Sequence, residues 1–209
     1  MPTLVGKRAP DFSAKAVVNG KIVENFTISQ FQGKKYVILF FYPKDFTFVC
    51  PTEIVAFQNA LKDFENRNVQ VIGCSTDSEY SHLAWINTPR AQGGIAGITF
   101  PIVSDINKTI SASYGVLAGE TSMDADGNPK AKGELVAYRG LFLIDKEGII
   151  QHEVVNNFPL GRSTEEELRM VDALQHFEQF GEVCPMNWHK GEKAMKPDAK
   201  STGEYLASK

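Results

Sequence analysis

The feature that most constrains the fold is an unbroken apolar run, Tyr36-Val37-Ile38-Leu39-Phe40-Phe41, which follows Gly33-Lys34-Lys35 and stops before Pro43. A strand with one solvated face alternates apolar and polar side chains, whereas this run is apolar at every position. Such a pattern is typical of a strand that is buried on both faces. We therefore expect it to be the central strand of an α/β sheet.

The residues after this strand predict a crossover to a parallel neighbour. An amphipathic helix is expected over residues 51–64, with Pro51 in its first turn, where the missing N–H of proline costs nothing. Four apolar residues fall at helical spacing: Ile54, Phe57, Leu61 and Phe64. A second apolar strand is expected over residues 69–74. Strand, helix and strand in this order predict a right-handed crossover in a mainly parallel sheet.

The remaining elements are predicted from turn and cap signals. Asn19-Gly20 is the preferred turn of a β-hairpin, here over residues 16–23. Ser163 and Glu166 form the capping box of a helix that runs to residue 180. Further expected elements are a helix at 81–87, strands at 99–103, 140–145 and 149–155, a turn at 146–148, and an exposed loop at 124–133. After Gly181 the sequence has few apolar residues and no clear period, which indicates a C-terminal arm that covers something or stays mobile.

The bulk properties exclude several classes of protein. The formal net charge of −3 gives none of the basic excess that a nucleic-acid-binding surface requires. The sequence shows no signal peptide and no apolar stretch of the roughly 18 residues that span a bilayer, so we expect a cytoplasmic protein with no membrane partner. The chain has three cysteines without a Cys-x-x-Cys pair and four scattered histidines, which predicts neither a disulfide framework nor a metal site.

Cys50 is the candidate nucleophile. It lies where a loop becomes a helix beyond the end of the central strand, and open α/β sheets form their sites there. The free N–H groups and the positive dipole end of a helix N-terminus favour a thiolate. If that thiolate attacks a peroxide, charge develops on both oxygens, and the Thr47 hydroxyl and backbone N–H groups could stabilise it. Pro43 could shield the thiolate from water.

The other two cysteines differ in their surroundings. Cys74 lies within an apolar strand, Val71-Ile72-Gly73-Cys74-Ser75, and is best interpreted as a buried packing residue. Cys184 follows the last helix, at the start of the C-terminal arm, and this position could allow it to reach a distant thiol. A thiol in that place could condense with an oxidised Cys50 to form a disulfide, although an inert thiol is the alternative.

Several spaced segments strongly resemble the peroxiredoxin family. They are the Pro43-x-x-x-Thr47-x-x-Cys50 motif, Val49-Cys50-Pro51-Thr52-Glu53, residues 82–90, residues 138–145, Leu160-Gly161-Arg162, and Gly181-Glu182-Val183-Cys184-Pro185. The resemblance covers roughly residues 3–190, and motifs that agree in order are more specific than any one of them. It implies a thioredoxin-like α/β fold with a central, mainly parallel mixed sheet, an N-terminal hairpin and a C-terminal arm.

The resemblance also implies an activity and the residues that carry it. It implies a thiol-dependent peroxidase domain over residues 1–180 and an arm over 181–209, acting on hydrogen peroxide and organic hydroperoxides in antioxidant defence without a cofactor. Cys50 would be peroxidatic and Cys184 resolving; Arg139 would hold the thiolate and the peroxide, with Glu53 and Arg162 in a supporting network. It further implies a disulfide between subunits, a homodimer, a decamer of five dimers, and thioredoxin or a flavoprotein disulfide reductase as reductant.

Three alternatives stay open. A thioredoxin-type thiol–disulfide oxidoreductase would share the fold, but it normally uses the Cys-x-x-Cys motif that is absent here. A ring-shaped assembly could act as a chaperone or scaffold, alone or beside a peroxidase activity. Cys50 and Cys184 could also be packing residues. The stretch 119–134 is longer than we expect at this place in the family, and its polar, Gly- and Pro-containing sequence indicates a surface insertion.

Overall fold

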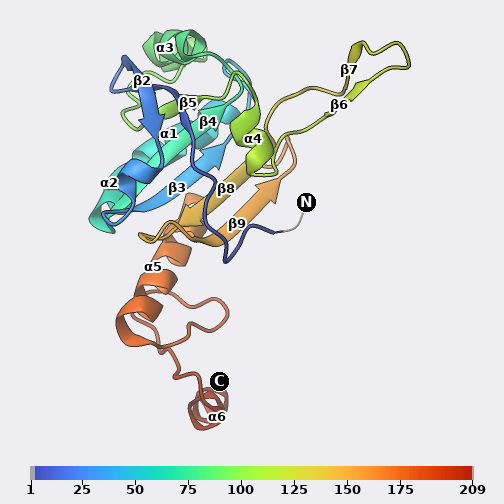
Figure 1. Cartoon of the computed structure of the whole chain (residues 1–209). Coiled ribbons are helices and arrows are strands. Elements are labelled where there is room, and N and C mark those ends of the chain that lie inside the picture. Colours follow the sequence, from blue (N-terminus) through green and yellow to red (C-terminus); the bar gives the residue numbers. More distant parts are fainter. Residues whose placement is uncertain (1–2, 209) are drawn as a thin grey trace. The chain divides into compact units, whose positions relative to one another are not determined.

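The apolar run of the sequence forms β3 (Tyr36–Phe41), and all of its residues are buried. In the computed structural model, which describes residues 3–208, β3 pairs in parallel with β4 (Val69–Ser75) and antiparallel with β8 (Arg139–Ile144). Within these residues the main sheet has seven strands in the order β2-β1-β5-β4-β3-β8-β9. The predicted central strand is thus confirmed (Figure 1).

The outer strands complete a mixed sheet. They are β1 (Ser13–Val18), β2 (Lys21–Thr27), β5 (Ile102–Ser104) and β9 (Ile150–Asn156). The central strands β3, β4 and β5 are parallel, whereas the β1–β2, β1–β5, β3–β8 and β8–β9 pairs are antiparallel, so the sheet is mixed as predicted but not mainly parallel. The hairpin predicted at residues 16–23 is β1–β2. Its turn residues Asn19 and Gly20 both have positive φ, 49° and 70°, as the short hairpin turn requires.

The helix predicted over residues 51–64 is two helices, α1 (Cys50–Asn59) and α2 (Leu61–Asn66). Ala60 separates them because its ψ is 1°, yet its N–H still bonds to the Ala56 carbonyl at 3.0 Å and its carbonyl accepts from Phe64 N–H at 3.2 Å. The apolar residues of the two helices therefore keep their helical spacing across the break. Phe57 and Phe64 both face the core, and the Phe57 ring stacks on Phe40 at 4.4 Å.

The other short helices are η1 (Ser29–Phe31), α3 (Glu79–Asn87), η2 (Arg90–Gln92) and α4 (Thr109–Ser113). Of these, only α3 was predicted. The α3 helix begins two residues before its predicted start because Ser78 accepts the Ser81 N–H at 3.2 Å as an N-cap. The strand predicted from residue 99 begins at Ile102, after Pro101, which has no N–H for a ladder.

Two predictions of irregular structure are wrong. The exposed loop at 124–133 is part of a β-hairpin, β6 (Glu120–Met123) and β7 (Pro129–Lys132), whose strand residues are all exposed. Its turn is closed by the Asp124 carboxylate, which accepts the Asp126 and Asn128 N–H groups at 3.0 and 2.9 Å. The arm, predicted without regular structure, contains α6 (Ala199–Ala207), capped by the Asp198 carboxylate.

The chain divides into two compact units between Arg162 and Ser163. The first unit contains the sheet, and the second contains α5 (Thr164–Phe180) and α6. Ser163 caps α5 by accepting the Glu166 N–H at 3.3 Å, as the capping-box pattern predicted. No helix of the described residues is both long and apolar enough to cross a membrane.

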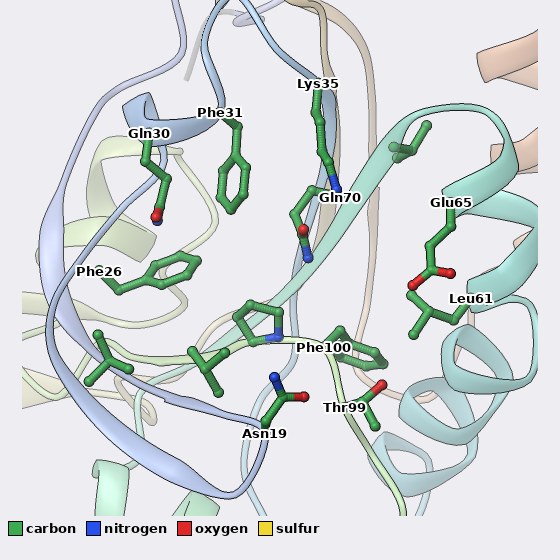
Figure 2. A pocket seen from close by; sticks show the side chains of 14 residues that line it. Asn19, Phe26, Gln30, Phe31, Lys35, Leu61, Glu65, Gln70, Thr99 and Phe100 are labelled. Atoms are coloured by element: carbon green, nitrogen blue, oxygen red, sulfur yellow. The ribbon is translucent and has the colours of Figure 1, made fainter.

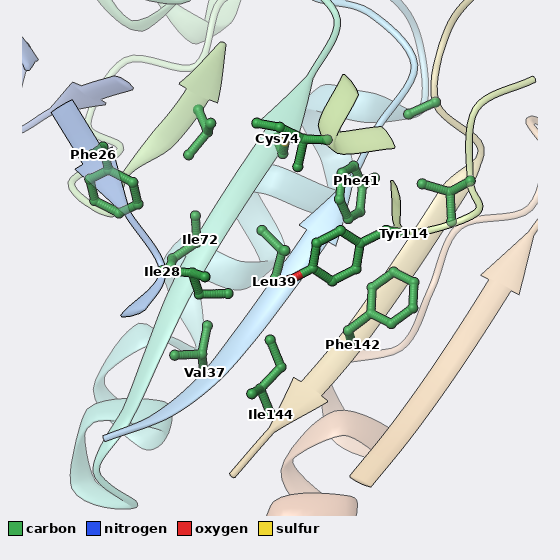
Figure 3. Close-up of a cluster of buried hydrophobic side chains, with 14 of the residues drawn as sticks. Phe26, Ile28, Val37, Leu39, Phe41, Ile72, Cys74, Tyr114, Phe142 and Ile144 are labelled. Carbon is green, nitrogen blue, oxygen red and sulfur yellow. The ribbon is translucent and has the colours of Figure 1, made fainter. Parts of the chain in front are cut away.

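A cluster of buried side chains lies on one face of β3, β4 and β8 (Figure 3). The rings of Phe41, Tyr114 and Phe142 meet there with centroids 4.9 to 5.9 Å apart. Cys74 belongs to this cluster and is fully buried, so its predicted packing role is confirmed. Burial, with a smaller contribution from Asp105, raises the pKa of the Cys74 thiol well above its usual value.

Leu39 tests how far the fold depends on the central strand, because its side chain is fully buried in this cluster. We expect Leu39→Ala to lower the free energy of unfolding by about 3 kcal/mol, through lost burial and the cavity left behind. Urea denaturation of both proteins measures this change. Val23→Ala, at a position 38% exposed on β2, is the control and should cost less than about 1 kcal/mol. Equal costs at the two positions would contradict the assignment of β3 as the centre of the core.

Candidate active site

Cys50 is the first residue of α1, just beyond the carboxyl end of β3, and is only 1% exposed. It lines a cavity of about 590 Å³. Four of the predicted site residues line this cavity: Pro43, Thr47, Cys50 and Arg139. The rest of the lining is Lys44, Phe48, Val49, Glu134, Val136, Phe158 and Pro159. The structure thus brings residues from distant parts of the sequence to the thiol.

Arg139 reaches Cys50 from the start of β8. Its Nη1 lies 3.5 Å from the Cys50 Sγ and donates to Glu53 Oε2 at 2.7 Å, while its Nε donates to the Phe158 carbonyl at 2.7 Å. Each of these contacts uses the planar fork of the guanidinium, which a lysine could not reproduce. Arg139 is itself 3% exposed, so its direction is fixed by buried partners.

Glu53, on the first turn of α1, holds a second arginine. Arg162 Nε and Nη2 donate to its two carboxylate oxygens at 2.8 and 2.9 Å, and the Arg162 backbone N–H donates at 3.0 Å. Arg162 Nη1 also bonds to the carbonyls of Phe41 and Gly140 at 2.9 and 2.6 Å. The predicted supporting network of Glu53 and Arg162 is therefore present as a set of contacts that ties α1 to β3 and β8.

The network beside Cys50 holds one carboxylate and two guanidiniums. The side chains of Glu53, Arg139 and Arg162 are each no more than 4% exposed, and one carboxylate faces two guanidiniums. A net positive charge in a region of low dielectric is costly unless an anion balances it. The Cys50 Sγ lies 3.5 Å from the Arg139 Nη1 that also donates to Glu53, at the positive end of the α1 dipole.

Thr47 and Pro43 are placed less decisively. The Thr47 hydroxyl donates to the Lys44 carbonyl at 2.9 Å, so its single proton is engaged within the loop rather than directed at a substrate. Its role as a donor to peroxide stays a prediction, because the hydroxyl has to rotate away from the Lys44 carbonyl before it can donate to a peroxide. Pro43 is half-buried and lines the cavity, and its role in shielding the thiolate from water also stays a prediction.

A buried carboxylate fixes the loop between β3 and α1. Asp45 accepts from the Tyr42 hydroxyl at 2.8 Å and the Ser81 hydroxyl at 2.7 Å, and its carboxylate lies 2.8 Å from His82 Nδ1. The other ring nitrogen of His82 lies 3.2 Å from the Val103 carbonyl. Sequence reasoning treated the histidines only as surface or packing residues and missed this link between the loop and α3.

Sequence reasoning also missed Phe158, Val136, Lys44 and Glu134 as parts of the cavity. Phe158 accepts a hydrogen bond from Arg139 through its backbone carbonyl. Every residue type has this carbonyl, so the sequence does not indicate which residue acts as the acceptor. The Phe158 ring stacks on Tyr138 at 5.0 Å. A Phe-Pro pair directly after a strand end was the available signal for Phe158. Lys44 and Glu134 form an ion pair of 2.9 Å that no local pattern predicts.

A second cavity, of about 440 Å³, lies elsewhere in the first unit between the β1–β2 hairpin and α2 (Figure 2). Phe26, Phe31 and Phe100 give it apolar walls, and Lys35 and Glu65 lie at its edge. Among the described residues that line it, none is a cysteine or a predicted site residue.

Cys184 lies in the second unit as a half-buried free thiol. Its Sγ is 3.7 Å from the Ala173 carbonyl of α5. Burial raises the pKa of the Cys184 thiol, the Arg169 guanidinium lowers it in part, and Glu182 raises it further. Trp188 is almost fully buried; Arg169 donates to its carbonyl at 3.3 Å and its ring faces His176 at 4.9 Å. Among residues 3–208 there is no group of His, Cys, Asp or Glu that could hold a metal ion.

Comparison with known proteins identifies the family. The AhpC/TSA family matches residues 5–153, and the C-terminal domain of 1-Cys peroxiredoxin matches residues 173–208. The chain is 52% identical over 204 residues to alkyl hydroperoxide reductase C of Helicobacter pylori, covering 97% of this chain and 96% of that protein. The chain is a peroxiredoxin. It is also 50% identical over 205 residues to a chloroplastic 2-Cys peroxiredoxin of Hordeum vulgare, covering 98% of this chain and 91% of the relative.

Solved structures agree with this assignment. The reduced 2-Cys peroxiredoxin of Plasmodium vivax superposes with a TM-score of 0.88 at 49% identity, covering 99% of this chain and all of that one. The mixed sheet described above is accordingly the thioredoxin-like fold of peroxiredoxins, as predicted. The activity of the chain is that of a thiol-dependent peroxidase in antioxidant defence. The predicted family, fold and enzyme class are confirmed.

Glu53→Gln tests the charge network. The change leaves two guanidiniums buried beside Cys50 without a carboxylate, so we expect the free energy of unfolding to fall by about 3 kcal/mol or more. Urea denaturation near neutral pH is the measurement. Glu65→Gln on α2 is the control, because Glu65 is 51% exposed and pairs with Lys62 only at 3.9 Å; it should cost less than about 1 kcal/mol. Similar losses for both variants would mean that Glu53 has no special electrostatic role.

The raised pKa of the Cys184 thiol predicts how its alkylation rate depends on pH. In a Cys50→Ser, Cys74→Ser protein, alkylation by iodoacetamide should rise with a midpoint above the usual thiol value of about 8.5, because burial favours the protonated form. A raised pKa means that the thiol contributes stability below its unfolded pKa and loses it as pH rises through the folded value. Arg169→Gln should move the midpoint higher still. A midpoint equal to that of the urea-unfolded protein would contradict the burial effect.

Proposed function

We propose that Cys50 is the peroxidatic cysteine, that Cys184 is the resolving cysteine, and that the two form a disulfide between subunits. The observation that carries the first assignment is the contact of 3.5 Å between Arg139 Nη1 and Cys50 Sγ in the lining of a cavity. A thiolate is the nucleophile for this chemistry, and a guanidinium stabilises it without giving up its own proton.

The first step is an attack of the Cys50 thiolate on one peroxide oxygen. A sulfur–oxygen bond forms and the O–O bond breaks, so the sulfur is oxidised to a sulfenic acid and the peroxide is reduced to an alcohol or water. The departing oxygen carries the electron pair and takes up a proton. Arg139 stabilises the negative charge on sulfur and on both oxygens as it shifts, which is where preorganised donors have the largest effect.

The neighbouring residues position these groups. Glu53 and Arg162 are positioning residues, because they hold Arg139 and the first turn of α1 without lining the cavity. Thr47 supplies a hydroxyl to the peroxide once it turns from the Lys44 carbonyl, and Pro43 keeps water from the thiolate. Both hydrogen peroxide and organic hydroperoxides are substrates in this proposal.

The second step is a condensation of the Cys184 thiol with the Cys50 sulfenic acid, which forms a disulfide and releases water. Cys50 is buried at the start of a helix, so its sulfur becomes accessible to another thiol only when the first turn of α1 opens locally. A dithiol reductant, thioredoxin or a flavoprotein disulfide reductase, then returns both cysteines to thiols. We place peroxidase function in residues 1–180, the resolving arm in 181–209, and the protein in the cytoplasm.

An edge strand supports the proposed homodimer. β9 is the last strand of the main sheet, and its beginning is covered by the N-terminal segment, where Gly6 N–H donates to the Ile150 carbonyl at 2.8 Å. Further along, Val155 is 50% exposed. An exposed strand edge is a template for pairing with a second copy of itself. Five such dimers would form the proposed decamer; among related structures, a Plasmodium yoelii peroxiredoxin with a modified N-terminus is described as an artifactual octamer.

The test is a non-reducing gel of reduced protein before and after one equivalent of hydrogen peroxide. A covalent dimer should appear with peroxide in wild type, because each Cys50 then joins the Cys184 of the other subunit. Cys74→Ser is the matched control and should leave the dimer intact, since Cys74 is buried in the core. Cys50→Ser and Cys184→Ser should each abolish it.

Thiol counts on the same samples separate the remaining outcomes. A monomer band with lost thiols would mean a disulfide within one chain or a one-cysteine route, and would overturn the arrangement between subunits. Unchanged thiols would overturn the assignment of Cys50 as peroxidatic.

A further inference from the structure

We propose that Glu134, through its ion pair with Lys44, is a specificity-determining residue that prevents Lys44 from favouring carboxylate-bearing over uncharged hydroperoxides at the Cys50 cavity. The inference rests on the proposed role of Cys50 and adds to it the class of substrate that the cavity admits. It also gives a function to the stretch 119–134, which the sequence marks as a surface insertion.

The cavity is larger than hydrogen peroxide needs. Its volume of about 590 Å³ is within the range of roughly 300–1,000 Å³ that is usual for drug-sized ligands. Apolar side chains make up much of its wall, among them Phe48, Val136 and Phe158. Phe48 is 93% exposed, so its ring is free to contact an apolar group of a substrate. An organic hydroperoxide could direct its O–O group to Cys50 and rest its tail on these side chains.

Charge at the mouth comes from one ion pair. Of the described residues that line the cavity, three are charged: Lys44, Glu134 and Arg139. Arg139 is buried and bonded to Glu53, whereas Lys44 and Glu134 have side chains that are 45% and 72% exposed. Their 2.9 Å contact leaves the mouth without net charge. Removing Glu134 leaves the positive charge of Lys44 at the mouth, and removing Lys44 leaves the negative charge of Glu134 there.

The hairpin stem sets the position of Glu134. The stem consists of the two backbone segments that lead into and out of the β6–β7 hairpin. Ala118 N–H donates to the Val136 carbonyl at 2.8 Å, and this bond pairs the two segments close to Glu134. Gly119, with a φ of +78°, packs so closely that a Cβ on it would lie 2.9 Å from the Glu134 carbonyl. The stem thus fixes the backbone of Glu134, and the carboxylate reaches the loop that carries Lys44.

The same hairpin provides a matched control. Lys132 and Glu120 form an ion pair of 3.9 Å across β6 and β7, with side chains 88% and 78% exposed. Neither residue lines the Cys50 cavity. Glu120→Gln therefore removes a carboxylate from the same hairpin without changing the charge at the mouth.

The first experiment compares kcat/KM for a fatty-acid hydroperoxide and for its methyl ester, which share a tail and differ only in the carboxylate. Glu134→Gln should raise the acid-to-ester ratio about three- to tenfold, because Lys44 is then free to attract the carboxylate. Lys44→Gln should lower the ratio, and Glu120→Gln should leave it as in wild type. These shifts should shrink in about 1 M salt, where the screening length is about 3 Å. An unchanged ratio in Glu134→Gln, or an equal change in Glu120→Gln, would overturn the proposal.

The second experiment does not depend on peroxidase activity. In a Cys74→Ser, Cys184→Ser background, Cys50 is alkylated in parallel with anionic iodoacetate and neutral iodoacetamide. Glu134→Gln should raise the iodoacetate-to-iodoacetamide rate ratio and Lys44→Gln should lower it. If peroxide is not consumed but these ratios shift as stated, the proposed function fails while the charge balance between Lys44 and Glu134 stands. Ratios that do not shift overturn that charge balance whatever the peroxidase result.

Discussion

The buried carboxylate of Glu53 is the interaction on which the site depends. It accepts hydrogen bonds from Arg139 and from Arg162, and these arginines in turn hold the Phe158, Phe41 and Gly140 carbonyls. One side chain on the first turn of α1 therefore joins the helix that carries Cys50 to strands β3 and β8. The group has an excess of one positive charge, and the Cys50 Sγ lies 3.5 Å from one of its guanidiniums. The contacts that hold α1 in place are therefore the same contacts that set the electrostatic surroundings of Cys50.

The sequence predicts the parts of this arrangement whose signals are local. The run at β3 is apolar at every position, Asn19-Gly20 matches one turn type, and Ser163 caps its helix, so each was predicted from neighbouring residues. Residues that act through distant partners give no such signal. Arg139 and Arg162 are ordinary charged residues in their local contexts, and only the resemblance to peroxiredoxins connected them with Cys50.

The wrong predictions have physical reasons as well. The β6–β7 hairpin has no buried face, so its strands lack the alternation of apolar and polar residues that identifies a strand. The α6 helix contains Ser201, Thr202 and Gly203, which lower helix propensity. Asp198 was the available signal, since its carboxylate accepts the Ser201 N–H at 2.7 Å. Ala60 interrupts the α1–α2 segment although alanine is the best helix former, which shows tertiary context overriding propensity.

The exposed hairpin β6–β7 has a practical consequence. Its tip, around Gly127, makes its hydrogen bonds with its own turn, while its stem is fixed near the cavity mouth. Exposed tips that are held only by local bonds tolerate added sequence. A dye, an affinity tag or a surface linker joined there would leave both termini and the β9 edge untouched. The hairpin is therefore a natural attachment point for immobilising the enzyme on an electrode or bead as a peroxide sensor.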